Sequence, residues 1–318
     1  MGRSDPEVPR PTRSRPPLPP RAALAGVLVL LAACATKRPV LGDLESELRA
    51  LAERHAGRRI ALVYLALDGG AETALDPDAS FHAASTMKLA VMIEAFRRAD
   101  AGDFDLEAQL PVHDEFASIV DGSPYSLSAG DDSDPELFEA RGATRSAREL
   151  VTRMIRRSSN LATNLLIERL DARRVQAGIE ALGATHGMQV RRGVEDGKAF
   201  RAGLNNVATA RDLAVLLRAI ARGEAASAAS CRAMLEILAG QEFRTMIPAG
   251  LPDGTVVAHK TGSITRIAHD AAIVDPFGPS PYVLVVLTAG FDDEGEACAA
   301  GAEFARRVHA AHLAQCRT

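Results

Sequence analysis

Apolar positions follow two different patterns at the start of this chain. A helical period covers residues 44–56, with Asp43 as the expected N-cap, and a continuous apolar run of strand length covers residues 60–67. An Asp-Gly-Gly turn at residues 68–70 leads into a second strand pattern at residues 71–75. The chain is therefore expected to begin with a helix and two adjacent strands.

The middle of the chain has helical patterns, and its end returns to strands. Ser146 to Glu149 has the form of a capping box that begins one helix, and Thr209 begins another that continues to Ala221. The late strands, which precede a long C-terminal helical pattern, are expected at residues 255–260, 270–274 and 282–288. This order predicts an α/β fold of the α+β kind, with one antiparallel sheet built from both chain ends and a helical lobe inserted.

The N-terminal segment predicts export from the cytoplasm. Residues 1–21 are rich in Arg and Pro, and residues 22–33 form an apolar run that is too short to span a bilayer but is suited to a secretory signal. The run ends in Leu31-Ala32-Ala33-Cys34, which resembles the lipobox of bacterial lipoproteins, where the cysteine becomes the lipid-modified first residue. Ordinary cleavage after Ala35, with release of a soluble protein, is the alternative.

The segments divide the chain into three parts. We expect a signal peptide of the lipoprotein type at residues 1–33, a tether at residues 34–42 and a domain at residues 43–318. Either route of processing places the domain outside the cytoplasm, on the periplasmic side of a bacterial membrane.

Charge excludes nucleic acid as a partner. The chain has 37 Lys and Arg and 41 Asp and Glu side chains; residues 1–33 hold five Arg and two acids, which leaves 32 basic and 39 acidic side chains. The mature net charge is therefore about −7, without a basic stripe. No metal-site spacing is present, and we expect a monomer that uses no metal and no cofactor.

Three cysteines remain after processing. Cys298 and Cys316 fall in one helical pattern, where eighteen residues of rise separate them by about 27 Å, too far for a disulfide. Two arrangements are therefore expected: Cys231 forms a disulfide with one of them, or all three cysteines are buried thiols.

Lysine is scarce in this chain, with only four among the 37 basic residues: Lys37, Lys88, Lys198 and Lys260. A buried lysine can lose its proton and act as a base, whereas arginine stays charged. Lys88 follows Ser85 by three residues at the start of an apolar helical run, so both side chains share one helix face. An amine one turn away can activate a serine hydroxyl as a nucleophile.

Two further motifs carry compatible chemistry. Lys260-Thr261-Gly262-Ser263 follows a strand pattern, where a cation and a hydroxyl can hold a carboxylate and the glycine lets a ligand approach the backbone. Ser158 and Asn160 lie at the junction of two helical patterns, where a hydroxyl and a carboxamide project together.

These three motifs, in this order, resemble the penicillin-recognising serine acyltransferases, which include the serine β-lactamases and the D-alanyl-D-alanine peptidases. The resemblance covers the chain from about Leu44 onward and is nearest to class A β-lactamases. It implies a β-lactamase/transpeptidase-like fold whose pocket lies between the helical lobe and the sheet. Ser159 stands where class A enzymes usually have Asp.

The resemblance also implies roles. Ser85 is the acylated nucleophile and Lys88 its base; Ser158 passes a proton to the leaving nitrogen. The substrate amide and carboxylate are held by Asn160, Lys260 and Thr261, and the oxyanion by the backbone N–H groups of Ser85 and Ser263.

Deacylation needs an activated water, for which class A enzymes use a glutamate followed closely by Leu-Asn. Here Glu195 lies in the right interval, but Leu204-Asn205 follows nine residues later. Glu195 is the expected base and Asp196 the fallback. A solvated Glu195 paired with Lys198 is the structural alternative.

The expected function is therefore a serine β-lactamase-like hydrolase that acts in β-lactam catabolism and antibiotic resistance. A D-alanyl-D-alanine carboxypeptidase that acts on cell-wall peptide uses the same acylation residues and is the nearest alternative. A non-catalytic protein that binds wall fragments on the same scaffold is the third. His259 and His269, which flank the third motif, are expected to be structural.

Overall fold

The computed structural model describes residues 1–2 and 41–316. The lipidation site expected at Cys34 lies outside these residues, as do residues 3–33 of the expected signal peptide and the tether up to residue 40. Among the helices of the described part, none is both long and apolar enough to cross a membrane.

A five-stranded sheet, in the order β2-β1-β11-β10-β9, forms the centre of the fold, and its neighbouring strands are antiparallel. β1 (Arg59–Ala66) and β2 (Glu72–Leu75) come from the start of the chain. β9 (Val257–Ile264), β10 (Ile267–Val274) and β11 (Tyr282–Ala289) come from its end. Because β1 pairs with β11, the early and late strands meet inside the sheet, and the expected sheet built from both chain ends is confirmed.

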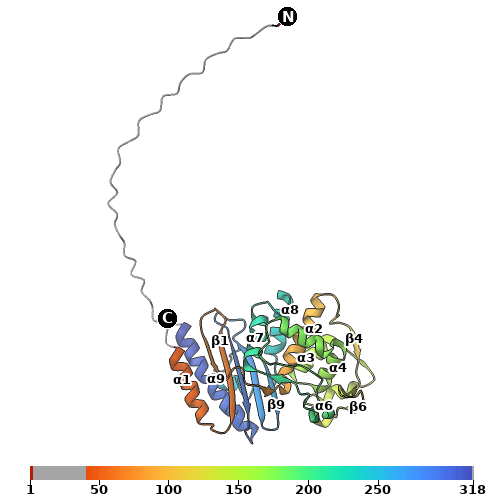
Figure 1. Ribbon diagram of the computed structural model, residues 1–318. Helices are drawn as coiled ribbons and strands as arrows, with labels where there is room; N and C mark the ends of the chain where they lie inside the picture. The colour runs from red at the N-terminus through yellow and green to blue at the C-terminus, as the bar shows by residue number, and fades with distance from the viewer. Residues whose placement is uncertain (3–40, 317–318) are drawn as a thin grey trace, which may run out of the picture. The chain divides into compact units, whose positions relative to one another are not determined.

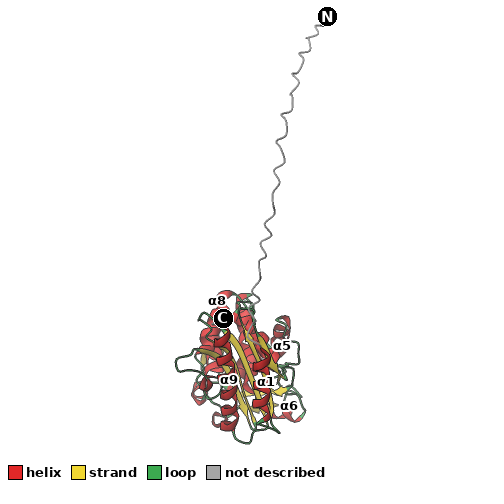
Figure 2. Ribbon diagram, turned by 90° about the vertical axis from the view of Figure 1, so that its left-hand side faces the viewer, coloured by secondary structure: helices red, strands yellow, loops and turns green. Residues whose placement is uncertain are grey.

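Helices cover both faces of this sheet. α1 (Leu41–Glu53) and α9 (Glu294–Cys316) pack against each other on one face, where Figure 2 shows them in front of the strands. α7 (Ala210–Ala221) packs against β1, β10 and β11 from the opposite face, and α8 (Ala228–Ala239) packs against β9.

Alternate residues of β11 therefore enter two different cores. Val283, Val285 and Leu287 join the core on the side of the helical lobe, whereas Tyr282 and Leu284 join the core under α1 and α9. Burial on both faces explains why this strand is apolar along its whole length rather than alternating.

The helical lobe is inserted between β2 and β9 and lies to one side of the sheet (Figure 1). Its helices are α2 (Lys88–Asp100), α3 (Ala147–Arg156), α4 (Asn160–Leu170), α5 (Ala172–Ala181) and α6 (Gly197–Arg201). Three pairs of short strands accompany them: β3 (Phe81–His82) with β8 (Val207–Ala208), β4 (Gln109–Pro111) with β7 (Thr144–Ser146), and β5 (Glu115–Ala117) with β6 (Pro124–Ser126).

The helix starts at Ser146 and Thr209 are confirmed. Ser146 Oγ accepts the Glu149 N–H at 3.1 Å, and Thr209 caps α7 in the same way. Only half of the expected capping box forms, because the Glu149 carboxylate binds Arg153 instead. The expected N-cap at Asp43 is wrong: α1 begins two residues earlier.

The strand boundaries differ most around the third motif. β9 extends to Ile264, four residues past its expected end, and β10 begins at Ile267 rather than residue 270. The Lys-Thr-Gly-Ser segment lacks apolar alternation, but pairing with β10 holds it extended, with Lys260 opposite Ala271 and Ser263 opposite Ala268.

All three described cysteines are free thiols. α9 is continuous from Glu294 to Cys316, so Cys298 and Cys316 are separated along one helix as expected. Cys231 and Cys298 are buried, but Cys316 is exposed, which corrects the expectation of three buried thiols.

Candidate active site

Ser85 lies in a short 3-10 turn, η1 (Ala84–Met87), that runs directly into α2 at Lys88. Ser85 and Lys88 therefore lie on successive turns of one helical segment, although its first turn is tighter than the α-helix expected from the sequence. Ala84, immediately before Ser85, has a left-handed φ of 45°. Thr86 is buried and fixes the turn by donating its hydroxyl to the Ala83 carbonyl at 2.6 Å.

Lys88 is fully buried beneath the site. Its Nζ donates to the Ser158 carbonyl at 2.6 Å and to Asn160 Oδ1 at 2.8 Å, and it lies 3.3 Å from Ser158 Oγ. Burial lowers the pKa of Lys88 to about 7, against the opposing charges of Asp132 and Glu195. A substantial fraction of this amine is thus neutral near pH 7 and able to accept a proton.

Ser158 lies between two amines. It occupies the junction of α3 and α4 with a left-handed φ of 57°, and Lys260 Nζ donates to its hydroxyl at 3.0 Å. Lys260 is also fully buried; burial and, next, the charge of Lys88 hold its pKa well below the usual lysine value, while Asp270 acts in the opposite sense. A hydroxyl held between two amines is suited to pass a proton.

Gly262 brings β9 against the turn that carries Ser85. A Cβ at this position would lie 2.8 Å from the Ser85 backbone nitrogen and 2.9 Å from that of Thr86. The glycine was expected to admit a ligand to the backbone; the structure shows that it admits the backbone of η1. The next residue, Ser263, is exposed, and Thr261 is half-buried.

Glu195 reaches the same place from the loop before α6. Its backbone has a left-handed φ of 62°, and its Oε1 accepts from Asn160 Nδ2 at 3.2 Å. Asn160 thereby joins Lys88 to Glu195. The expected alternative, a surface pair between Glu195 and Lys198, is wrong, because Lys198 binds Asp121 at 3.0 Å.

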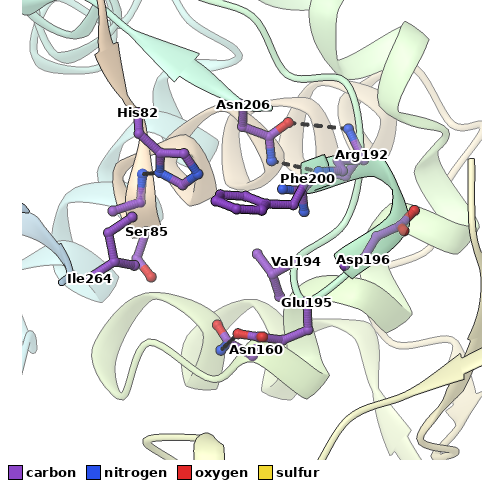
Figure 3. Close-up of a pocket in the computed structure, with 12 residues that line it drawn as sticks. His82, Ser85, Asn160, Arg192, Val194, Glu195, Asp196, Phe200, Asn206 and Ile264 are labelled. Atoms are coloured by element: carbon purple, nitrogen blue, oxygen red, sulfur yellow. Dashed lines mark hydrogen bonds between the residues drawn. The ribbon is translucent and has the colours of Figure 1, made fainter. Parts of the chain in front are cut away.

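These groups line or underlie a cavity of about 350 Å³ (Figure 3). Ser85, Asn160 and Glu195 line it, together with His82, Phe200 and Ile264. Phe200 and Ile264 are unusual in being large apolar side chains that are 55% and 45% exposed. The structure therefore brings Ser85, Lys88, Ser158, Asn160, Glu195 and the Lys260 segment together.

A model of the β-lactamase enzyme family matches residues 43–312. The chain belongs to this family. Its function is that of a serine β-lactamase-like hydrolase.

Solved structures agree with the family. The β-lactamase of Sphaerobacter thermophilus is 26% identical with a TM-score of 0.70, over 88% of this chain and 99% of that one. PBP-A is 26% identical with a TM-score of 0.72, over 86% and 97%. An ancestral class A β-lactamase is 25% identical with a TM-score of 0.72, over 84% and 99%. The expected β-lactamase/transpeptidase-like fold is confirmed.

Within this β-lactamase fold, Asp196 positions the loop and is not retained as a base. Its buried carboxylate accepts from Ser118 Oγ and from the N–H groups of Ile119 and Ala199, each at 3.0 Å. Burial raises its pKa, but these hydrogen bonds and the charge of Arg192 lower it overall. Figure 3 shows Asp196 turned away from Ser85.

The hydrogen bond made by Ser159 explains why serine can replace aspartate in the second motif. Its buried hydroxyl caps α4 by accepting the Ala162 N–H at 3.2 Å, a bond that an aspartate side chain would also accept. The substitution leaves Asn160, the first residue of α4, in place.

Sequence reasoning missed the side chains that hold the Glu195 loop. Asn164 Oδ1 accepts the Val194 N–H at 2.7 Å, and its Nδ2 donates to the Val194 carbonyl at 3.0 Å. Gly193 is required beside it, because a Cβ there would lie 2.4 Å from Asn164 Oδ1. The available signal was spacing: Asn164 follows Asn160 by one helical turn and so shares its face.

The displaced Leu204-Asn205 pattern serves the same loop. Asn205 Oδ1 accepts from the Arg192 guanidinium at 3.0 Å, and Asn206 bonds the backbone of Arg191 and Arg192. These amides support the loop rather than extend toward Glu195.

Proposed function

We propose that this protein opens β-lactam rings through an acyl-Ser85 intermediate, using its own side chains and backbone N–H groups. The observation that supports this most is the position of Ser158 Oγ, 3.0 Å from Lys260 Nζ and 3.3 Å from Lys88 Nζ, in the cleft that Ser85 lines. Three proton-carrying groups in contact form a relay from the nucleophile to the leaving group.

Acylation follows from these positions. Ser85 Oγ attacks the lactam carbonyl and gives its proton to neutral Lys88, while the backbone N–H groups of Ser85 and Ser263 donate hydrogen bonds to the oxyanion. The C–N bond then breaks, and the ring nitrogen takes a proton from Ser158, which is replaced from the adjacent amines. Lys260 and Thr261 hold the substrate carboxylate, and Asn160 holds its amide.

Hydrolysis of the ester is the second step. Glu195 takes a proton from a water that attacks the acyl carbon, and the ester oxygen returns to Ser85 as a hydroxyl. The hydrogen bond from Asn160 orients the Glu195 carboxylate toward this water.

Acylation is expected to rise with pH through about 7, because only neutral Lys88 accepts the Ser85 proton and its pKa lies at about 7. The neutral fraction increases from about one tenth at pH 6 to about nine tenths at pH 8. Stopped-flow measurement of the acylation rate should therefore give an increase of about tenfold over this interval. Lys88→Arg, which keeps the charge but stays protonated, should lose both the rate and the pH dependence; a pH-independent rate in the unaltered protein would contradict the role of Lys88.

A D-alanyl-D-alanine carboxypeptidase is the second candidate, and the loop favours it in one respect. The Asn205 and Asn206 amides are bound to Arg192 and its neighbours, so Glu195 holds the attacking water with fewer partners. PBP-A, a similar protein, has been solved in a variant form as an acyl-enzyme with penicillin G. Rapid turnover of a chromogenic cephalosporin supports the β-lactamase; an adduct that persists for hours, with cleavage of a D-alanyl-D-alanine peptide, supports the peptidase.

We also propose, from sequence alone, that the protein is exported and lipid-anchored through Cys34. Membrane fractionation of the unaltered protein and of Cys34→Ala tests the anchor. We expect the unaltered protein in the membrane fraction and the variant in the soluble fraction; finding both in the same fraction would contradict the anchor.

A further inference from the structure

His82 contacts the nucleophile turn from β3, three residues before Ser85. Its Nδ1 accepts the Ala84 N–H at 3.1 Å. Its ring also lines the cavity and meets the Phe200 ring edge-on, with centroids 6.4 Å apart (Figure 3). His82 takes no part in the proton transfers proposed for the reaction.

The residue that His82 holds is conformationally strained. Ala84 has a φ of 45°, a region that residues with a Cβ rarely occupy and that persists only where neighbouring contacts enforce it. On its other side, Ala84 faces Gly262 of β9. A Cβ added at Gly262 would be only 3.2 Å from the Cβ of Ala84, so the turn is packed closely against β9. Because Ala84 directly precedes Ser85, its conformation sets the direction of the Ser85 N–H and hydroxyl.

This contact requires a particular protonation state. An imidazole nitrogen accepts a hydrogen bond only when it carries no proton, so Nδ1 is bare and His82 is neutral with its proton on Nε2. Burial and the charge of Arg192 lower the pKa of His82, which favours that state. His269 bonds the His82 carbonyl at 3.0 Å, and Glu195 and Asp196 line the same cavity.

We propose that His82 is a positioning residue: by accepting the Ala84 N–H it holds the turn that carries Ser85, and protonation of His82 releases the turn and slows acylation. The proposal rests on the proposed function in one respect, that Ser85 is the acylated residue. It adds a group, outside the three motifs, that makes nucleophile geometry depend on pH.

Two substitutions separate the hydrogen bond from the ring. In His82→Asn, Oδ1 takes the place of Nδ1 and accepts the N–H two residues on, as in an Asx-turn, but does not titrate. In His82→Leu, the apolar bulk remains and the acceptor is lost. The asparagine variant is thus the matched control for the leucine variant.

The test measures two quantities in the full-length protein and both variants. The first is acylation by penicillin G between pH 5 and 8, from intact mass after rapid quenching. The second is hydrogen–deuterium exchange of the peptide that contains Ala84 and Ser85, at pH 7 without β-lactam.

At pH 7 and above, His82→Leu should acylate about tenfold or more slowly and exchange the Ala84 amide faster, whereas His82→Asn should retain both within about threefold. Once the pH falls below the lowered pKa of His82, the unaltered protein requires two deprotonations, at Lys88 and His82, so the plot of log rate against pH should steepen toward a slope of about 2. In His82→Asn the slope should remain about 1, since Lys88 alone titrates.

Equal acylation and exchange in His82→Leu and the unaltered protein would overturn the proposal. So would a His82→Asn variant as slow as His82→Leu, or the same acid slope in His82→Asn as in the unaltered protein. If no form acylates at all, the proposed function fails, while the exchange measurement still decides whether His82 holds Ala84.

Discussion

Ser85→Ala is expected to abolish turnover of β-lactams and every covalent adduct. Ser85 lines the cavity, and Lys88, Ser158 and Lys260 contact one another beside it; alanine leaves these three groups in place but has no atom to attack the carbonyl. The loss in kcat should be about 10⁴-fold or more, because removal of a nucleophile disables the rest of the machinery. Hydrolysis of a chromogenic cephalosporin and intact mass after penicillin G measure the two effects.

A serine remote from the cleft provides the control. Ser230 is half-buried in α8, where its hydroxyl donates to Asp100, and Ser230→Ala should hydrolyse and acylate as the unaltered protein does. An adduct that forms on the Ser85→Ala protein would refute the assignment of the nucleophile.

Glu195→Gln should separate the two chemical steps. Glutamine keeps the length of the side chain, and its oxygen can still accept the hydrogen bond from Asn160 Nδ2, but it cannot take a proton from water. We expect acylation at a nearly unchanged rate, a fall in kcat of about 10²- to 10⁴-fold, and an acyl-enzyme that accumulates to nearly the whole protein. Quenched-flow intact mass follows the adduct, and steady-state kinetics give kcat.

The control for this change is Glu168→Gln. Glu168 is an exposed carboxylate on α4 that pairs with His113, so its replacement should leave both steps unaltered. Turnover in Glu195→Gln equal to that of the unaltered protein would remove Glu195 from the mechanism. If acylation and deacylation slowed equally, Glu195 would stabilise the geometry of the site rather than activate the water.

The sequence predicted the parts of the site that depend on residue chemistry and short spacing. Ser85 and Lys88 could be paired because a spacing of three residues along a helix fixes their separation. Lys260 could be singled out because lysine is scarce in this chain. The sheet was predictable from the short apolar runs at both chain ends, and the pairing of β1 with β11 bears this out.

Features set by backbone geometry and distant contacts were not predictable. Ala84 and Glu195 have a left-handed φ although both carry a Cβ, and this conformation has no local signature, unlike a glycine in a turn. The anchoring of Asp196 by Ser118 joins residues 78 positions apart. Likewise, β9 runs through Gly262 because β10 pairs with it, although the sequence there lacks strand character.

The most direct measurement is the location and lifetime of the adduct in the unaltered protein. Penicillin G is mixed with the protein, the reaction is quenched after milliseconds to minutes, and peptides are mapped by mass. We predict one adduct, on Ser85, that forms rapidly and disappears as the substrate is consumed. Consumption of penicillin with no adduct on Ser85 at any time, or with an adduct on another residue, would contradict acyl-serine catalysis at this site.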